Sequence, residues 1–106
     1  MTNHIRTQDP VIRAQQWARM SLCTTAIAIE LELARKLRAF LASAKAYQVV
    51  EWHYPRPETE LLKALAKAIK QGQERLTTTT EKILSLNSEL EALKTALVDD
   101  YGDDTI

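Results

Sequence analysis

The sequence predicts an all-α protein: a long antiparallel helical hairpin with a coiled-coil seam, which dimerises into a four-helix bundle. Glycine and proline, which end helices and form turns, occur only two and three times in 106 residues. Two of the prolines stand together mid-chain, in the segment EWHYPRPE at residues 51–58. The second half carries a heptad repeat of apolar residues, which is typical of helices that pack lengthwise.

The helix boundaries follow from capping residues and prolines. Asp9 can accept a backbone N–H as N-cap, and Pro10 suits the first helical position because its missing donor would be unpaired there. Pro55 breaks a helix, and Tyr54 before it is pushed out of helical geometry. The expected layout is a flexible N-terminus at 1–9, a helix at 10–52, a turn at 53–57, a helix at 58–98 and an acidic flexible tail at 99–106.

The second helix has a regular apolar repeat. The residues that recur every seven positions are Leu62, Ile69, Leu76, Ile83, Leu90 and Leu97. Three positions after the first five of these stand Leu65, Gly72, Thr79, Leu86 and Leu93. Gly72 and the threonines at 77–80 are poor helix formers, and Thr78 with Glu81 has the spacing of a capping box, so a break between 72 and 78 is the alternative. The heptad phase passes through without a slip, which favours one continuous helix.

The first helix carries more apolar surface than one seam requires. One apolar line consists of Leu22, Ala26, Ile29, Leu33, Leu37, Phe40, Ala44 and Tyr47. A second line consists of Met20, Cys23, Ile27, Leu31, Ala34 and Leu41. The second helix can cover only one line, so we expect the other to meet another chain, most simply a second copy. The predicted oligomer interface is Met20, Ile27, Leu31, Leu41, Leu76, Ile83 and Leu90.

The turn concentrates unusual side chains. Trp52, His53, Tyr54 and Arg56 form a candidate partner-binding site, because Trp, Tyr and Arg often dominate binding energy and a proline turn holds them with little entropy to lose. The interpretation that we favour is structural: Trp52 and Tyr54 fold back to plug the end of the hairpin, with Arg56 stacked on a ring or paired with a neighbouring glutamate.

Residues for chemistry are scarce. The single Cys23 excludes an internal disulfide and lies among apolar residues, which is typical of a small buried side chain. His4, His53 and Cys23 are far apart in sequence, so neither a metal site, nor a cofactor site, nor a catalytic set is expected. No signal peptide or membrane-spanning stretch is recognised, so we expect a cytoplasmic protein with no membrane partner.

We therefore expect a non-enzymatic protein–protein interaction module, a small adaptor, assembly chaperone or inhibitor, that binds another protein through its apolar helix faces and the aromatic turn. Net charge is zero, but residues 1–50 carry +4 and residues 51–106 carry −4. The alternative function is a nucleic-acid-binding or regulatory dimer that uses the basic first helix through Arg6, Arg13, Arg19, Arg35 and Arg38. A purely structural, self-assembling coiled coil is the third possibility.

Overall fold

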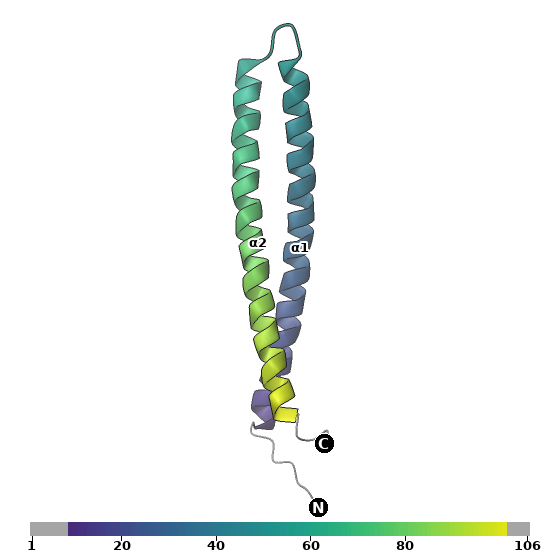
Figure 1. The fold of residues 1–106 in the computed structure, drawn as a ribbon, viewed down its shortest axis with the longest axis vertical. Coiled ribbons are helices and arrows are strands. Elements are labelled where there is room, and N and C mark those ends of the chain that lie inside the picture. Colours follow the sequence, from purple (N-terminus) through teal and green to yellow (C-terminus); the bar gives the residue numbers. More distant parts are fainter. Residues whose placement is uncertain (1–8, 102–106) are drawn as a thin grey trace, which may run out of the picture. The chain divides into compact units, whose positions relative to one another are not determined.

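The computed structural model describes residues 9–101, with side chains as far as residue 97, and it contains two helices (Figure 1). α1 spans Pro10–Trp52, and α2 spans Thr59–Tyr101. No strand occurs in the described range, so the all-α prediction is confirmed. The observed ends of α1 are those expected, whereas α2 begins one residue later and ends three residues later than residues 58 and 98. The expected flexibility of residues 1–8 and 102–106 lies outside the described residues.

The start of α1 follows the expected capping pattern. The Asp9 Oδ1 atom accepts the backbone N–H of Val11 at 2.7 Å, and the Asp9 carbonyl accepts the N–H of Arg13 at 3.0 Å. Asp9 therefore satisfies donors of the first turn that would otherwise have no partner inside the helix.

α2 runs without interruption through residues 72–78, so the three-helix alternative is wrong. The threonines are accommodated through their own hydroxyls. Those of Thr77, Thr78 and Thr80 donate to the carbonyl oxygens four residues earlier, at 3.1, 3.1 and 2.8 Å. This back-bonding gives the polar groups partners inside the helix, which lets the segment remain helical.

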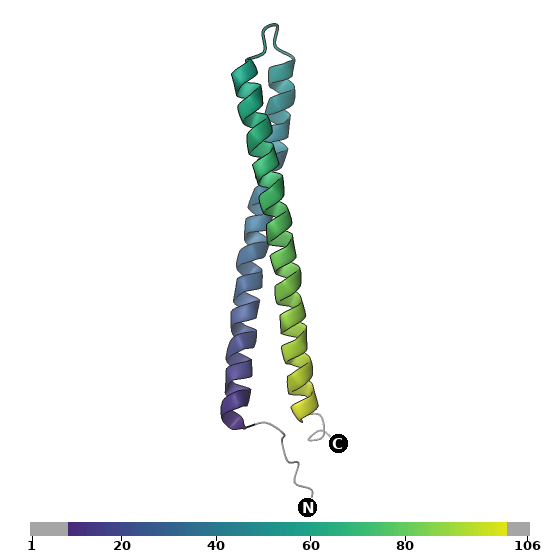
Figure 2. The same ribbon diagram turned by 90° about the vertical axis from the view of Figure 1, so that its left-hand side faces the viewer.

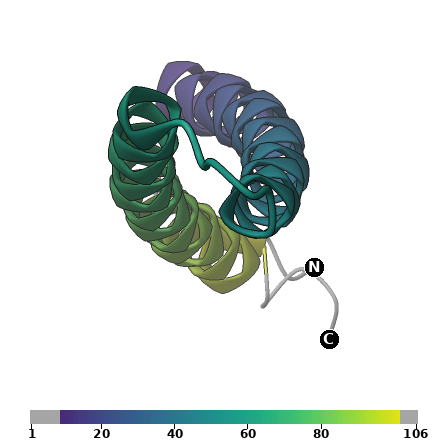
Figure 3. The same ribbon diagram turned by 90° about the horizontal axis from the view of Figure 1, so that it is seen from above.

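The described residues fall into two compact units, and each is described by itself. The turn unit is Glu30–Lys82; the terminal unit holds α1 up to Ile29 and α2 from Ile83. In the turn unit, α1 and α2 run side by side in opposite directions (Figures 1 and 2). Figure 3 shows the connecting segment crossing from the end of α1 to the start of α2. The turn unit is therefore an antiparallel helical hairpin. In the terminal unit the two helices are joined by the Arg19–Glu89 ion pair.

Exposure along α2 follows the predicted heptad. Every heptad position from Leu62 to Leu97 is buried or half-buried in its own unit. The most deeply buried are Leu62, Ile69 and Thr79 in the turn unit and Leu97 in the terminal unit. The apolar repeat thus marks the face of α2 that is removed from water.

α1 has a matching stripe, which contains every residue of the predicted second line except Leu31. Most of its buried or half-buried residues recur with the same 3-4 spacing: Arg13, Gln16, Met20, Cys23, Ile27, Glu30, Ala34, Leu37, Leu41, Ala44, Gln48 and Glu51. Ala26 and Leu33, which are also half-buried, lie beside this stripe. Five members are polar or charged and three are small, so this stripe is less apolar than the surface beside it. Glu30 is tolerated there because its carboxylate pairs with Lys82 of α2 at 2.9 Å.

The core of the turn unit is small and tightly spaced. Leu41, Ala44 and Ile69 form a buried cluster, with Leu76 packed against it. A Cβ atom built on Gly72 would lie 3.0 Å from Leu41 Cδ2, so glycine makes room for the leucine opposite it. Large side chains on one helix thus lie opposite small residues on the other, which brings the helices close together.

Candidate protein-binding surfaces of the turn unit

The aromatic residues at the turn do not plug the hairpin. Trp52 is 62% exposed and Tyr54 is 55% exposed, so the plug interpretation is wrong. His53 and Arg56 are exposed as well, and Arg56 forms no ion pair with any described residue. The structure thus presents all four predicted partner-binding residues to solvent, and their role in binding stays a prediction.

Glu51 closes the end of the hairpin instead. It is only 6% exposed, although it is charged and belongs to the last turn of α1. Its Oε1 atom accepts the backbone N–H of Glu58 at 2.9 Å, and the Glu58 carbonyl accepts the N–H of Leu62 as α2 begins. A carboxylate at a helix N-terminus satisfies a free donor and interacts favourably with the helix dipole. Glu51 therefore links the end of one helix to the start of the other.

Hydrogen bonds also hold the backbone at the end of α1. The N–H groups of His53 and Tyr54 donate to the carbonyls three residues earlier, at 3.1 and 3.2 Å. The His53 ring donates from Nδ1 to the Val49 carbonyl at 2.7 Å, which fixes the ring nitrogen that carries the proton there. No described residue has a positive φ, so the turn needs no glycine. These bonds support a fixed turn beneath exposed side chains.

Large apolar side chains gather in the last turns of α1. Tyr47, Val49, Val50, Trp52 and Tyr54 are each more than half exposed. Single exposed apolar residues are ordinary, whereas five within eight positions leave much apolar area in water around the end of α1.

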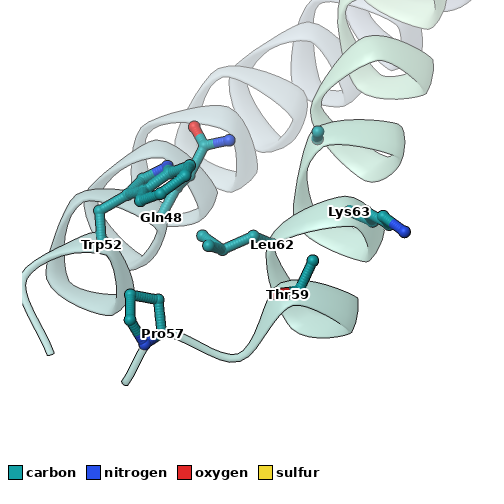
Figure 4. A pocket seen from close by; sticks show the side chains of 7 residues that line it. Gln48, Trp52, Pro57, Thr59, Leu62 and Lys63 are labelled. Atoms are coloured by element: carbon teal, nitrogen blue, oxygen red, sulfur yellow. The ribbon is translucent and has the colours of Figure 1, made fainter. Parts of the chain in front are cut away.

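An open groove of about 430 Å³ lies beside the turn. Trp52 and Gln48 form its α1 wall, Leu62 points into it from α2, and Pro57 lies at its end (Figure 4). Thr59, Lys63 and Ala66 complete the lining. The groove thus has an apolar floor with polar groups around it, a combination that is common in binding sites.

The hairpin of the turn unit has two lateral sides. Each side consists of the residues of both helices whose heptad positions flank the buried stripes on that side. The groove brings Trp52 and Ala66 together, which identifies the first side. We call it the Trp52 side; its residues, all exposed, are Leu31, Arg35, Arg38, Ala42, Lys45, Val49 and Trp52 of α1 and Thr59, Lys63, Ala66, Lys70, Gln73, Thr77 and Thr80 of α2.

The second side carries fewer charges and more large apolar side chains. A smaller groove of about 320 Å³ joins Phe40 of α1 to Ala68 and Arg75 of α2 there. We call it the Tyr47 side; its residues are Leu33, Lys36, Phe40, Ser43, Tyr47 and Val50 of α1 and Leu61, Ala64, Ala68, Gln71, Arg75, Thr78 and Lys82 of α2. Neither side contains an acidic residue.

The predicted oligomer-interface residues occupy different places. Leu41 is buried, and Met20, Ile27, Leu76, Ile83 and Leu90 are half-buried, all on the stripes between α1 and α2. Leu31 is 51% exposed, outside those stripes. The structure describes one chain, so contact of these residues with a second chain stays a prediction. The apolar residues of α1 that remain most exposed belong mainly to its other line, which includes Leu22 and Ile29 in the terminal unit.

The basic residues of α1 are partly engaged. Arg19 pairs with Glu89, and Arg35 pairs with Glu32 one turn away. Hydrogen bonding from Arg35 lowers the pKa of Glu32, and the same bond raises the pKa of Arg35. Arg13 is half-buried and Arg38 is exposed, while Arg6 lies outside the described residues. A continuous row of free arginines does not form along the described part of α1.

Groups suited to catalysis do not converge. No three His, Cys, Asp or Glu side chains in the described range lie close enough to bind a metal ion together. Cys23 is 5% exposed; burial, followed by the neighbouring Glu89 carboxylate, raises the pKa of its thiol. Thiolate formation is therefore disfavoured at neutral pH.

Neither α1 nor α2, as far as residues are described, contains a segment long and apolar enough to cross a bilayer. Comparison with protein-family models, with curated proteins and with solved structures found no match for this chain.

Proposed function

We propose that this protein is a non-enzymatic protein-binding module that acts through the sides of its helical hairpin, as an adaptor, assembly chaperone or inhibitor. One observation carries the proposal: the turn unit leaves an apolar lateral side uncovered. Phe40 is 44% exposed, and Tyr47 and Val50 are each 54% exposed, on the same side of α1. α2 covers only the stripe of α1 that faces it, so the neighbouring Tyr47 side is left available to another chain.

The first partner we propose is a second copy. Two hairpins that meet along their Tyr47 sides form an antiparallel four-helix bundle, in which each copy covers the apolar side of the other. Ala64 and Ala68 on α2 are small and leave room for the aromatic rings of a facing helix. Lys36 at the edge of this side and Arg75 beside its groove can keep their charges in water while their stems pack.

The test is solution mass by light scattering over a wide range of concentration. A dimer has twice the monomer mass of 12.0 kDa and dissociates on dilution. Tyr47→Glu places a charge in the interface and is expected to weaken association by at least about a hundredfold. Leu84→Glu is the matched control, because Leu84 is 62% exposed and belongs to the terminal unit.

A 12.0 kDa species at every concentration would refute self-association. Equal weakening by Tyr47→Glu and Leu84→Glu would place the interface elsewhere. Circular dichroism of each variant verifies that the helices remain formed, so that a change in mass reports the interface.

The runner-up function is nucleic-acid binding through α1. It receives less support, because Arg19 and Arg35 already pair with glutamates of the same chain. Retention of the protein on DNA or RNA that falls steeply with salt would favour this function.

A further inference from the structure

The Trp52 side differs from the Tyr47 side in charge and in shape. Five basic residues lie on it: Arg35, Arg38, Lys45, Lys63 and Lys70. Arg35 and Lys63 each have a glutamate one turn away on their own helix, whereas no described residue pairs with Arg38, Lys45 or Lys70. This side is therefore strongly basic at neutral pH.

The acidic residues of the turn unit are placed away from this side. Glu30 and Glu51 lie on the stripe between the helices, Glu58 lies in the turn, and the others, Glu32, Glu60, Glu74 and Glu81, lie on the helix faces opposite the seam. Glu30 and Glu51 are also engaged, with Lys82 and with the start of α2. The unit thus has seven acids, and none of them occupies a position of this side, although Glu32 and Glu60 pair with Arg35 and Lys63 from the adjoining faces.

Shape and apolar contact add to the charge. The groove runs between the two helices, with Trp52 on one wall and Leu62 and Ala66 on the other (Figure 4). The Trp52 ring is 62% exposed beside it, so a partner side chain can pack against the ring. Farther along α1, Ala42 is small and exposed, which allows close approach of another backbone.

We propose that the Trp52 side binds an acidic amphipathic helix of a partner protein, which packs between α1 and α2 as a third helix. An aliphatic side chain of that helix enters the groove against Trp52 and Leu62. Its carboxylates meet Lys45, Lys63 and Lys70 on either side of the groove. Apolar anchors between flanking charges are the usual pattern when a helix docks in a groove. This surface lies opposite the side proposed for self-association, so both can be occupied at once.

The experiment uses the full chain with Trp17→Phe, which leaves Trp52 as the only tryptophan. The probe is a designed helical peptide of three heptads, with leucines on one face and glutamates beside them. A second peptide has lysines in place of those glutamates, and a single-stranded oligothymidylate serves as a non-peptide anion. The expected result is saturable binding of the acidic peptide with a blue shift of Trp52 emission, weakening as salt is added.

Charge reversal locates the site. Lys63→Glu and Lys70→Glu are each expected to weaken peptide binding about three- to tenfold at low salt. Lys94→Glu is the matched control, because Lys94 is exposed and pairs with Glu91 one turn away at 3.6 Å, much as Lys63 pairs with Glu60 at 3.5 Å. Lys94→Glu and Tyr47→Glu are expected to leave the affinity unchanged, and the latter separates this proposal from self-association.

Three results would overturn the proposal. One is equal binding of the acidic and the basic peptide, which would mean that apolar contact drives binding and charge does not contribute. Another is a loss with Lys94→Glu as large as with Lys63→Glu. The third is tighter binding of the oligothymidylate than of the acidic peptide, which would assign this side to nucleic acid through stacking on Trp52.

Discussion

Replacing Gly72 by alanine tests how closely the two helices of the turn unit approach. An alanine in a helix interior is about 1 kcal/mol more favourable than glycine, so the exchange alone should stabilise α2. The new Cβ would lie 3.0 Å from Leu41 Cδ2 and 3.2 Å from Phe40 Cε2. Phe40 is 44% exposed and can turn aside, whereas Leu41 is 6% exposed and packs against Ala44 and Ile69.

Overpacking of a core typically costs about 1–3 kcal/mol. We take the middle of that range, because a single methyl group meets one confined leucine, and subtract the gain in helix propensity. Gly72→Ala should therefore lower the free energy of unfolding by about 1 kcal/mol. Urea denaturation followed by circular dichroism measures this at one fixed protein concentration, since self-association would also contribute to stability.

Two further variants separate the opposing terms. Ala64→Gly, at an exposed position of the same helix, should cost about 1 kcal/mol. Because Ala64 lies on the Tyr47 side, this cost is measured in a Tyr47→Glu background, where self-association is weakened and the change reports helix propensity. In a Leu41→Val background, where the clashing methyl group is withdrawn, Gly72→Ala should become stabilising by about that amount. The close approach at Gly72 is refuted if Gly72→Ala in the natural background raises the free energy of unfolding by as much as Ala64→Gly lowers it. The new methyl group would then meet no resistance from Leu41.

Three other variants address charge and capping. Glu51→Ala should lower the free energy of unfolding by about 1–2 kcal/mol, measured by urea denaturation, because α2 loses the acceptor at its N-terminus. The Cys23 thiol should react with a maleimide far more slowly in the folded protein than in urea. Its raised pKa adds stability that is present below roughly pH 8.5 and is lost as the pH rises through the folded value, and Glu89→Gln should reduce this dependence in alkaline unfolding curves. The lowered pKa of Glu32 adds stability that is present above roughly pH 4.3 and is lost as the pH falls; acid titration of Arg35→Ala should show a smaller loss.

Much of the fold could be predicted, because it depends on local signals. Asp9 and Pro10 mark the start of α1, and the heptad of α2 marks its buried face even through the threonines. The partner stripe on α1 was recognised only between Met20 and Leu41, because Glu30 within it and Gln48 and Glu51 beyond it are polar. Their burial becomes acceptable only once Lys82 and the start of α2 are in place, and this depends on tertiary contacts that helix periodicity does not contain.

The candidate site was predicted only in part. Composition pointed to Trp52 and Tyr54, but it favoured rings folded back onto the end of the hairpin, whereas both are exposed. Their exposure depends on which side chain closes the end of the hairpin, and Glu51 does so. The division of the turn unit into a basic side and an apolar side follows from the heptad phase of both helices together. Since the phase of α1 was hidden by polar residues, the side that carries each residue could be assigned only from the structure.

The contact between Glu51 and Glu58 has a consequence for the order in which the chain folds. The two residues are seven positions apart, so joining them costs little loop-closure entropy. The Arg19–Glu89 contact, by comparison, joins residues 70 positions apart. Starting from the turn, each successive pair of helix turns closes onto a register that is already set, so no single step has to close a long loop. The protein should therefore fold like a zipper from residues 51–58 outward, and rapidly for its length. Glu51→Ala should slow folding more than it speeds unfolding.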